Sequence, residues 1–228
     1  MMKKSETAIR SAQIQADNNH LGTPLTTRER IIDESLTLFS QRGYSGVSVK
    51  NIADAVEIKD SSLYKHFTSK REIFDTILAE MTERMDQLTD NLKLADASKG
   101  NASSYFSTMS VNDLVALSEQ VFLFYLKNPF AARFRRMLTI EQYRDSEIST
   151  LYRKIFTEDS IAYQSILFGQ LIECGAFIEA DPTILAMNFY SPLLLLFIRY
   201  DAQPDKESEA LDLLERHVRE FARRYRVS

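Results

Sequence analysis

The sequence has few of the residues that would indicate disulfides, metal sites or many tight turns. Its 228 residues include one cysteine, no tryptophan, three histidines, 6 glycines and 5 prolines. A single cysteine excludes an intrachain disulfide, and we expect Cys174 to be a small buried residue in a protein of a reducing compartment. The histidines are far apart in the sequence and offer no zinc pattern. Because no glycine-rich phosphate loop or nucleophile elbow is present, we predict no catalytic residue, no metal and no cofactor.

Long apolar runs are also missing. The first 24 residues contain no apolar segment of signal-peptide length, and the most apolar run, residues 193–198, is too short to span a bilayer. We therefore expect a cytoplasmic protein without a membrane partner. Residues 1–24 are expected to form a mostly disordered arm. The formal net charge of −4 does not fit a chain built as a whole for binding nucleic acid.

Helical periodicity dominates the rest of the sequence. Apolar residues recur at spacings of three and four, and no alternating strand pattern is present. This pattern predicts an all-α protein. The Ser-rich residues 96–111 break the periodicity, so we expect a flexible loop there. Helices are predicted to begin at Thr26, Ser48 and Ser69, to include a short helix near 60–66, and to continue near 112–127, 129–142, 145–156, 157–174, 183–200 and 206–225.

Two capping boxes mark helix starts near the N-terminus. In Thr26-x-x-Glu29 and Ser69-x-x-Glu72, a hydroxyl and a carboxylate are placed to accept free N–H groups of the first turn. Gly43 is expected to end the first helix, and a turn at 56–58 separates the second helix from the third. Three short helices with such a turn form a helix-turn-helix unit, whose third helix enters the major groove of DNA by its N-terminal end.

The predicted third helix separates residues for packing from residues for DNA. Leu63 and Phe67 lie four residues apart, so they share the helix face that packs on the core of the helix-turn-helix unit. Short polar side chains and cations on the other faces are available to DNA, and those at the edge can reach phosphate oxygens. The first group consists of Ser61, Ser62 and Lys65, and the second of Tyr64, His66 and Lys70.

The stretches "RERIIDESLTLFSQRGYSGVSVKNIADAV" and "SLYKHFTSKREIF" resemble the DNA-binding head of the tetracycline-repressor (TetR) family of bacterial transcription regulators. The resemblance implies a three-helix helix-turn-helix head at residues 25–72 and a C-terminal helical bundle at 73–228 that binds a ligand and forms a homodimer. It also implies contacts to the DNA backbone by Thr26, Thr27, Ser48, Tyr64, His66 and Lys70, and contacts to base edges by Lys50, Asp60, Ser61 and Ser62.

Two residues depart from the family pattern. Glu57 stands at a turn position that is usually glycine, and a left-handed backbone there costs another residue about 1 kcal/mol, so a different turn is expected. Lys59 replaces a usual capping serine, which leaves Asp60 as the alternative cap. A carboxylate that faces DNA is unfavourable beside phosphates unless it caps the helix or accepts from a cytosine amine. Both departures bear on affinity for DNA.

The predicted C-terminal bundle, residues 73–228, is called the body here, and it is rich in aromatic residues. Of the 24 Phe and Tyr residues, 17 lie between 105 and 200. Most are expected in the core, and some are expected to line a pocket for a small, mostly apolar effector, since helical bundles hold ligands between their helices. The candidates for the pocket are Phe134, Met137, Tyr152, Phe156, Tyr163 and Phe189.

The helices predicted at 157–174 and 183–200 are too apolar for one core to bury every face, so we expect them to pair with their twofold copies in a homodimer. Together these features predict a repressor that a small molecule releases from a palindromic operator, with repression favoured over activation by the resemblance alone. Two alternatives stay open at this point. One is a DNA-binding protein of this fold that answers to a protein partner, and the other is a helical enzyme or carrier with a vestigial head.

Overall fold

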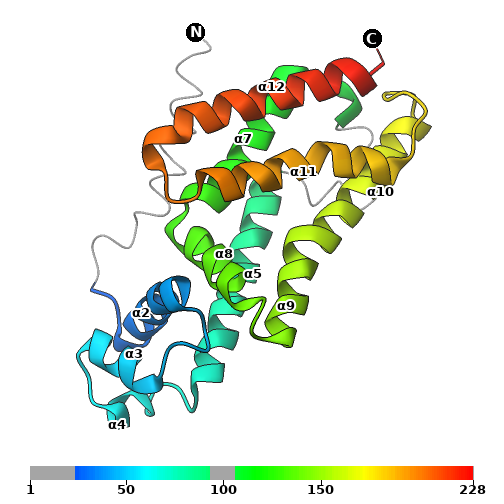
Figure 1. Ribbon diagram of the computed structural model, residues 1–228. Coiled ribbons are helices and arrows are strands. Elements are labelled where there is room, and N and C mark those ends of the chain that lie inside the picture. The colour runs from blue at the N-terminus through cyan, green and yellow to red at the C-terminus, as the bar shows by residue number, and fades with distance from the viewer. Residues whose placement is uncertain (1–23, 93–105, 228) are drawn as a thin grey trace.

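The computed structural model describes residues 24–92 and 106–227. Every regular element in these two segments is a helix, and one isolated bridge joins Phe177 to Arg226. Figure 1 shows a small head of short helices below a larger helical body. The predicted all-α fold with an N-terminal helix-turn-helix head is therefore confirmed. The predicted arm at 1–24, apart from its last residue, and most of the predicted loop at 96–111 lie outside the described residues.

The head begins with the caps that the sequence predicts. The Thr26 hydroxyl accepts from the N–H of Glu29, whose carboxylate accepts in return from the N–H of Thr26 at 2.7 Å. The first helix ends at Gly43, whose φ of 77° suits glycine. Ser48 forms a second reciprocal box with Asn51. The helices of the head are α2 (Thr27–Arg42), α3 (Val49–Val56), α4 (Asp60–Leu63) and α5 (Lys70–Asn91).

The cap of α5 differs in one detail from the predicted capping box. The Ser69 hydroxyl accepts from the N–H of Glu72 at 3.1 Å, as predicted. The Glu72 carboxylate, however, accepts from the N–H and the hydroxyl of Thr68, at 2.6 and 2.7 Å, and not from the N–H of Ser69. These hydrogen bonds lower the pKa of Glu72. The reciprocal half of the box is thus shifted by one residue.

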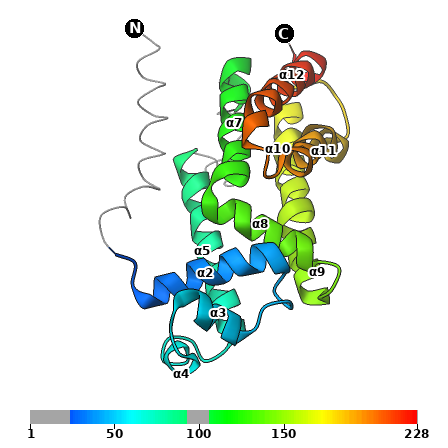
Figure 2. The same cartoon turned by 60° about the vertical axis from the view of Figure 1, so that its left-hand side comes forward.

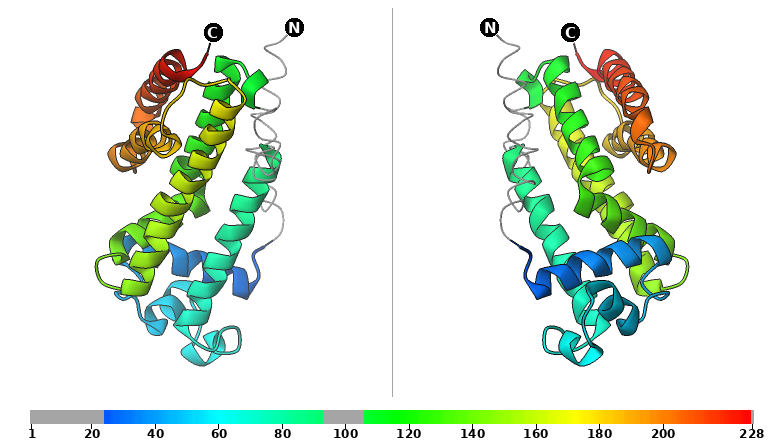
Figure 3. Two further views of the ribbon diagram at one scale, coloured as in Figure 1. Left: turned by 90° about the vertical axis from the view of Figure 1, so that its right-hand side faces the viewer. Right: turned by 90° about the vertical axis from the view of Figure 1, so that its left-hand side faces the viewer.

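The helices of the body begin and end close to the predicted positions, with one exception. The predicted break between residues 156 and 157 is wrong, because α9, a short π-helix and α10 form one continuous rod (Figure 3). No glycine or proline lies near the predicted break, since the first one after residue 146 is Gly169 in α10. The elements are α7 (Val111–Lys127), α8 (Pro129–Glu141), α9 (Ser146–Arg153), the π-helix η2 (Lys154–Glu158), α10 (Asp159–Glu173), α11 (Pro182–Tyr200), the 3₁₀-helix η3 (Pro204–Lys206) and α12 (Glu207–Tyr225).

The loop prediction is also wrong for the last residues of its range. Residues 106–108 form a helical turn, and the side chains of Phe106 and Met109 are buried. They pack in one cluster with Phe168 and Phe177. Serine residues are typical of loops, but burial of the two large apolar side chains in this stretch is favourable and holds its end in the helical body.

Head and body share a continuous core. Ile31 and Phe39 of α2, Ile77 of α5 and Phe134 of α8 are all buried in the same cluster. Figure 2 shows α2 lying across α8, with α5 running from the head into the body. The residues of α5 that pack in this core extend from Ile73 to Met81, so the core crosses the predicted domain boundary at residue 72. That boundary stays a prediction.

The helix α11 is long and apolar enough to cross a membrane by length and composition alone, and it is the one such helix in the described segments. In the structure it packs against α7, α10 and α12. Its buried residues include Leu185, Leu193 and Phe197. A core helix of a soluble protein passes the same test, so the feature by itself does not assign a membrane partner.

Candidate DNA-binding surface and internal cavity

The turn between α3 and α4 has the left-handed backbone that the family pattern provides with glycine. Glu57 adopts φ 62° and ψ 42°, so the expected change of the turn is wrong. The N–H of Glu57 donates to Asp54, and the next N–H, that of Ile58, donates to Ala53 at 3.0 Å. The Arg30 guanidinium donates to the carbonyl of Val56 at 2.6 Å and so closes the end of α3. These contacts hold Glu57 in a conformation that its own preference disfavours.

This geometry predicts that Glu57→Gly raises the free energy of unfolding by up to about 1 kcal/mol, because glycine tolerates a positive φ without steric cost. Urea denaturation followed by circular dichroism measures the change. Ala55→Gly is the matched control, since it places glycine at an exposed helical position of α3 and should lower stability by about 1 kcal/mol. Equal destabilisation by both substitutions would contradict the assigned strain.

The short helix α4 lies at the tip of the head, away from the body (Figure 1). Leu63, the last residue of α4, and Phe67 are both buried, which fits their predicted role of anchoring this helix to the core. Lys59 is the N-cap residue, but no side chain caps the helix, so the alternative cap by Asp60 does not form. Asp60 instead lies in the first turn, where a carboxylate interacts favourably with the helix dipole.

Most side chains predicted to contact DNA are accessible on this head. Tyr64 follows α4 and is 53% exposed. The hydroxyls of Thr26 and Ser48 donate to Glu29 and Asn51, so both are already part of the helix caps. Thr27 and Ser62 are half-buried. The remaining exposed residues of the predicted set are Lys50, Asp60, Ser61, Lys65 and His66.

Lys70 has a structural role that the sequence did not indicate. Its ammonium donates to the carbonyls of Tyr44 and Val47, at 2.9 and 2.8 Å, and lies 4.2 Å from the centre of the Tyr44 ring. Burial lowers the pKa of Lys70, and the nearby Glu141 carboxylate opposes this shift. A contact from Lys70 to phosphate would have to use the N–H that these two bonds leave over.

The residues between α2 and α3, which include Tyr44 and Val47, form the Tyr44 loop. The body contacts this loop through Glu141, at the end of α8. Its side chain is fully buried, and one carboxylate oxygen accepts from the hydroxyl of Ser45. The other oxygen, Oε2, has no hydrogen-bond partner among the described residues and would lie against any Cβ added at Gly43. Glycine at position 43 is therefore required by its positive φ and by this close approach.

A second connection between head and body lies on the surface. The Arg71 guanidinium donates to both oxygens of Glu147 in α9, at 2.7 and 2.6 Å, and to Asp75 at 2.8 Å. These bonds raise the pKa of Arg71 and lower that of Glu147. The start of α5 is thus held by the body on one side and by the Tyr44 loop on the other.

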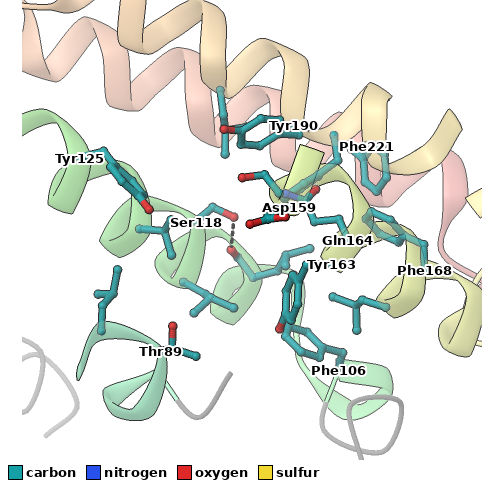
Figure 4. Close-up of a pocket in the computed structure, with 18 of the residues that line it drawn as sticks. Thr89, Phe106, Ser118, Tyr125, Asp159, Tyr163, Gln164, Phe168, Tyr190 and Phe221 are labelled. Carbon is teal, nitrogen blue, oxygen red and sulfur yellow. Dashed lines mark hydrogen bonds between the residues drawn. The ribbon is translucent and has the colours of Figure 1, made fainter. Parts of the chain in front are cut away.

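The body contains a cavity of about 460 Å³, within the size range of ligand pockets (Figure 4). Its wall is mostly aliphatic and aromatic and comes from α5, α7, η2, α10, α11 and α12. Three of the six predicted residues line it, namely Phe156, Tyr163 and Phe189. Tyr152 packs on the ring of Phe156 without lining the cavity.

Phe134 and Met137 lie elsewhere. Both are fully buried in the core that joins head and body, and neither lines the cavity. The aromatic content of the body therefore indicated the presence of a pocket, but it did not separate pocket residues from core residues. The polar residues Ser118 and Gln164 also line the cavity, but α7 and α10 contain several other polar residues, so the sequence did not single these two out.

Most hydroxyls in the cavity wall donate to main-chain carbonyls. Tyr190 donates to the carbonyl of Phe156 at 2.8 Å, and Ser160 donates to that of Ile155 at 3.1 Å. Both acceptors belong to η2, and π-helical turns inside α-helices are frequent at functional sites. The Tyr125 hydroxyl has no hydrogen-bond partner in the described part of the chain, and burial raises the pKa of Tyr125 and of Tyr190.

A three-helix head with a helix-turn-helix unit, joined to a helical body that contains a cavity, defines a protein of the helix-turn-helix class. Residues 31–77 match the family model described as "Bacterial regulatory proteins, tetR family". The head of this chain is thus similar to the DNA-binding head of the TetR family, and the described residues have the all-α fold of TetR-family structures. The resemblance found in the sequence is confirmed.

Three comparisons give the extent of the similarity. The head is 48% identical over 48 residues to the biofilm operon icaADBC negative transcriptional regulator IcaR of Staphylococcus aureus, a match that covers 21% of this chain and 26% of that protein. This chain thus spans about a quarter of the length of the curated relative it matches.

Two solved structures extend the similarity of fold to the body. A protein described as a TetR-family transcriptional regulator from Mesorhizobium loti superposes with a TM-score of 0.62 at 19% identity and covers 88% of this chain and 97% of its own. The triclosan complex of SmeT, the repressor of the multidrug efflux pump SmeDEF of Stenotrophomonas maltophilia, gives a TM-score of 0.55 at 19% identity, with 89% and 92% covered.

Proposed function

We propose that the protein is a transcriptional regulator that binds operator DNA as a homodimer and releases it when a small molecule occupies the body cavity. The observation that carries the proposal is the intact turn at Glu57, which presents α4 and Tyr64 at the tip of the head despite the departure from glycine. The negative regulator IcaR and the repressor SmeT support repression as the mode of action. The triclosan complex of SmeT supports a small molecule as the effector.

An exposed apolar stripe on α11 supports a homodimer. Four large side chains at i, i+3, i+11 and i+14 share one face of this helix, since eleven residues complete about three turns. Beside the stripe, α10 exposes Ile166 at 61%. Exposed apolar side chains that share one helix face in this way mark an interaction site, although the polar residue Ser191 lies between the two pairs. The residues of the α11 stripe are Ile184, Met187, Leu195 and Ile198.

The helix α5 supplies a direct mechanical link between the cavity and the DNA-binding surface. Lys70, at its first position, holds the Tyr44 loop of the head, whereas Met85, Leu88 and Thr89, toward its end, line the cavity. A ligand that displaces this end of α5 also moves the head. Two heads must match fixed half-sites, so a shift of a few Å between them breaks contacts on one side.

Release requires that the ligand prefer the state that does not fit DNA, because a ligand that binds both states equally shifts nothing. A coupling of about 1–3 kcal/mol lowers affinity for the operator roughly 5–150-fold. The same factor must appear when ligand affinity is measured with and without operator DNA. The cavity favours this mechanism over control by a protein partner.

Fluorescence anisotropy with DNA that flanks the gene of the protein tests the function. Binding is expected to weaken steeply as salt rises, because contacts to phosphates release counterions. Lys65→Ala should reduce the slope of log affinity against log salt by about 1, and Tyr64→Phe should weaken binding about equally for all sequences. Lys206→Ala, on the body, is the matched lysine control and should change neither quantity. Affinity that is equal for flanking and random DNA and insensitive to Lys65→Ala would refute the proposal.

A further inference from the structure

The polar side of the cavity contains acceptors that lack donors. Asp159, the first residue of α10, is exposed, lines the cavity and makes no hydrogen bond or ion pair with any part of the chain that the structure describes. On the same helix, the side-chain oxygen of Gln164 is inaccessible to solvent and has no hydrogen-bond partner among the described residues. Figure 4 shows these two side chains close together, beside Tyr190. A buried acceptor without a donor is unfavourable, as at Gln164, whereas the exposed carboxylate of Asp159 stays open to a donor from another molecule.

The neighbouring hydroxyls do not supply those donors. Ser118 donates its hydrogen to the carbonyl of Leu114 at 2.8 Å, and Ser160 and Tyr190 donate theirs to η2. Each hydroxyl therefore presents lone pairs, and not a hydrogen, to the rest of the cavity. These three hydroxyls therefore act as acceptors toward the cavity, and Asp159 is the one acidic residue among the described residues that line it.

One cation also lines the cavity, and it is engaged elsewhere. Arg226 follows α12, and its guanidinium donates to the carbonyl of Ser107 at 3.1 Å. A ligand with a carboxylate would need this residue, because the described wall offers it no other cation. Aromatic rings, by contrast, are abundant beside Asp159, and their faces attract cations. Phe156, Tyr163 and Tyr190 all line the cavity.

We propose, on the basis of the function proposed above, that the effector is a lipophilic amine. Its protonated nitrogen donates a hydrogen bond to the Asp159 carboxylate, and its apolar part fills the aliphatic and aromatic remainder of the cavity. The Asp159 contact is a charge-assisted hydrogen bond, which is about twice as strong as a neutral one.

Three probes with the same ten-carbon chain isolate the head group: decylamine, decanol and decanoate. Binding is measured at neutral pH by titration calorimetry, below the concentrations at which the probes form micelles and without DNA. Decylamine is expected to bind at least about tenfold more tightly than decanol, and decanoate more weakly than both. Asp159→Asn should remove most of the preference for the amine and leave decanol affinity within about twofold.

Glu158→Gln is the matched control, because this neighbouring carboxylate is exposed like Asp159 but does not line the cavity. It should leave all three affinities unchanged. Tightest binding by decanoate that is lost in Arg226→Gln, an unchanged amine preference in Asp159→Asn, or no binding by any probe would overturn the proposal. If Asp159→Asn does not fold, the order of the three probes on the wild-type protein still decides.

The DNA experiment separates this proposal from the function on which it rests. If decylamine binds as expected but leaves DNA binding unchanged, the chemistry of the site stands and release of DNA fails. If the flanking DNA is bound specifically and none of the probes binds, the amine is refuted while the DNA-binding function stands.

Discussion

The double variant Leu195→Glu, Ile198→Glu is expected to be a folded monomer that binds operator DNA at least about 100-fold more weakly than the wild type. Both side chains are more than 60% exposed on α11, so the substitutions leave the core of the single chain intact. In a dimer they would place four carboxylates in an apolar interface, where unpaired charges are strongly unfavourable. Loss of the second head removes an avidity of about 10²–10⁴.

Sedimentation velocity measures the assembly, and anisotropy measures DNA binding. Ile178→Glu is the matched control, because Ile178 is an exposed isoleucine between α10 and α11 that lies outside the stripe. It should remain a dimer with unchanged affinity. A wild-type protein that is monomeric at micromolar concentration would rule out the interface, and a double variant that remains dimeric would place the interface on another surface.

Substitution of Lys70 by methionine is expected to lower the free energy of unfolding by about 2 kcal/mol. The carbonyls of Tyr44 and Val47 would lose a charged donor, and such bonds contribute about 1.5–3 kcal/mol each before water replaces them at a partly exposed site. The buried carboxylate of Glu141 would also lose the cation that stabilises it. The loop that positions the start of α3 should loosen, and binding of DNA should weaken with it.

A double-mutant cycle with Glu141→Gln tests this assignment. If Lys70 and Glu141 interact, Lys70→Met should cost less in the Glu141→Gln background than in the wild type, by about 1 kcal/mol. Arg71→Met is the control, because this neighbouring cation is exposed and its ion pairs should contribute far less to stability. Weakened DNA binding without any loss of stability in Lys70→Met would show that Lys70 contacts phosphate and has no structural role.

The sequence predicted the helices of this protein well because their limits depend on neighbouring residues. The hydroxyls of Thr26 and Ser48 and the backbone freedom of Gly43 act within one turn, so a local pattern was sufficient. The turn at Glu57 could not be predicted in this way. Its left-handed backbone is unfavourable for the residue alone, and the contact that stabilises it comes from Arg30, 26 residues away from Val56 in the sequence.

The cavity was harder to predict for a related reason. Phe156 and Phe134 are both aromatic residues on apolar helix faces, and nothing in their local sequence separates a pocket wall from a core. The difference depends on which helices pack opposite each face. The polar residue Gln164 carries more information, because its buried side-chain oxygen needs a partner that the described residues do not provide.

The π-helix η2 also decides the direction in which each part of the rod faces. Each residue of an α-helix advances the side chains by about 100°, and a π-helical turn accommodates roughly one residue more than an α-helical turn. The side chains of α10 are therefore rotated relative to a regular continuation of α9. Ile148 on the α9 side packs in the core shared with the head, whereas Phe168 on the α10 side packs beside the cavity. One extra residue thus lets a single straight helix serve two cores that lie in different directions. Deletion of the exposed Lys154 would rotate the two core-facing sides relative to each other without removing any side chain that lines either core.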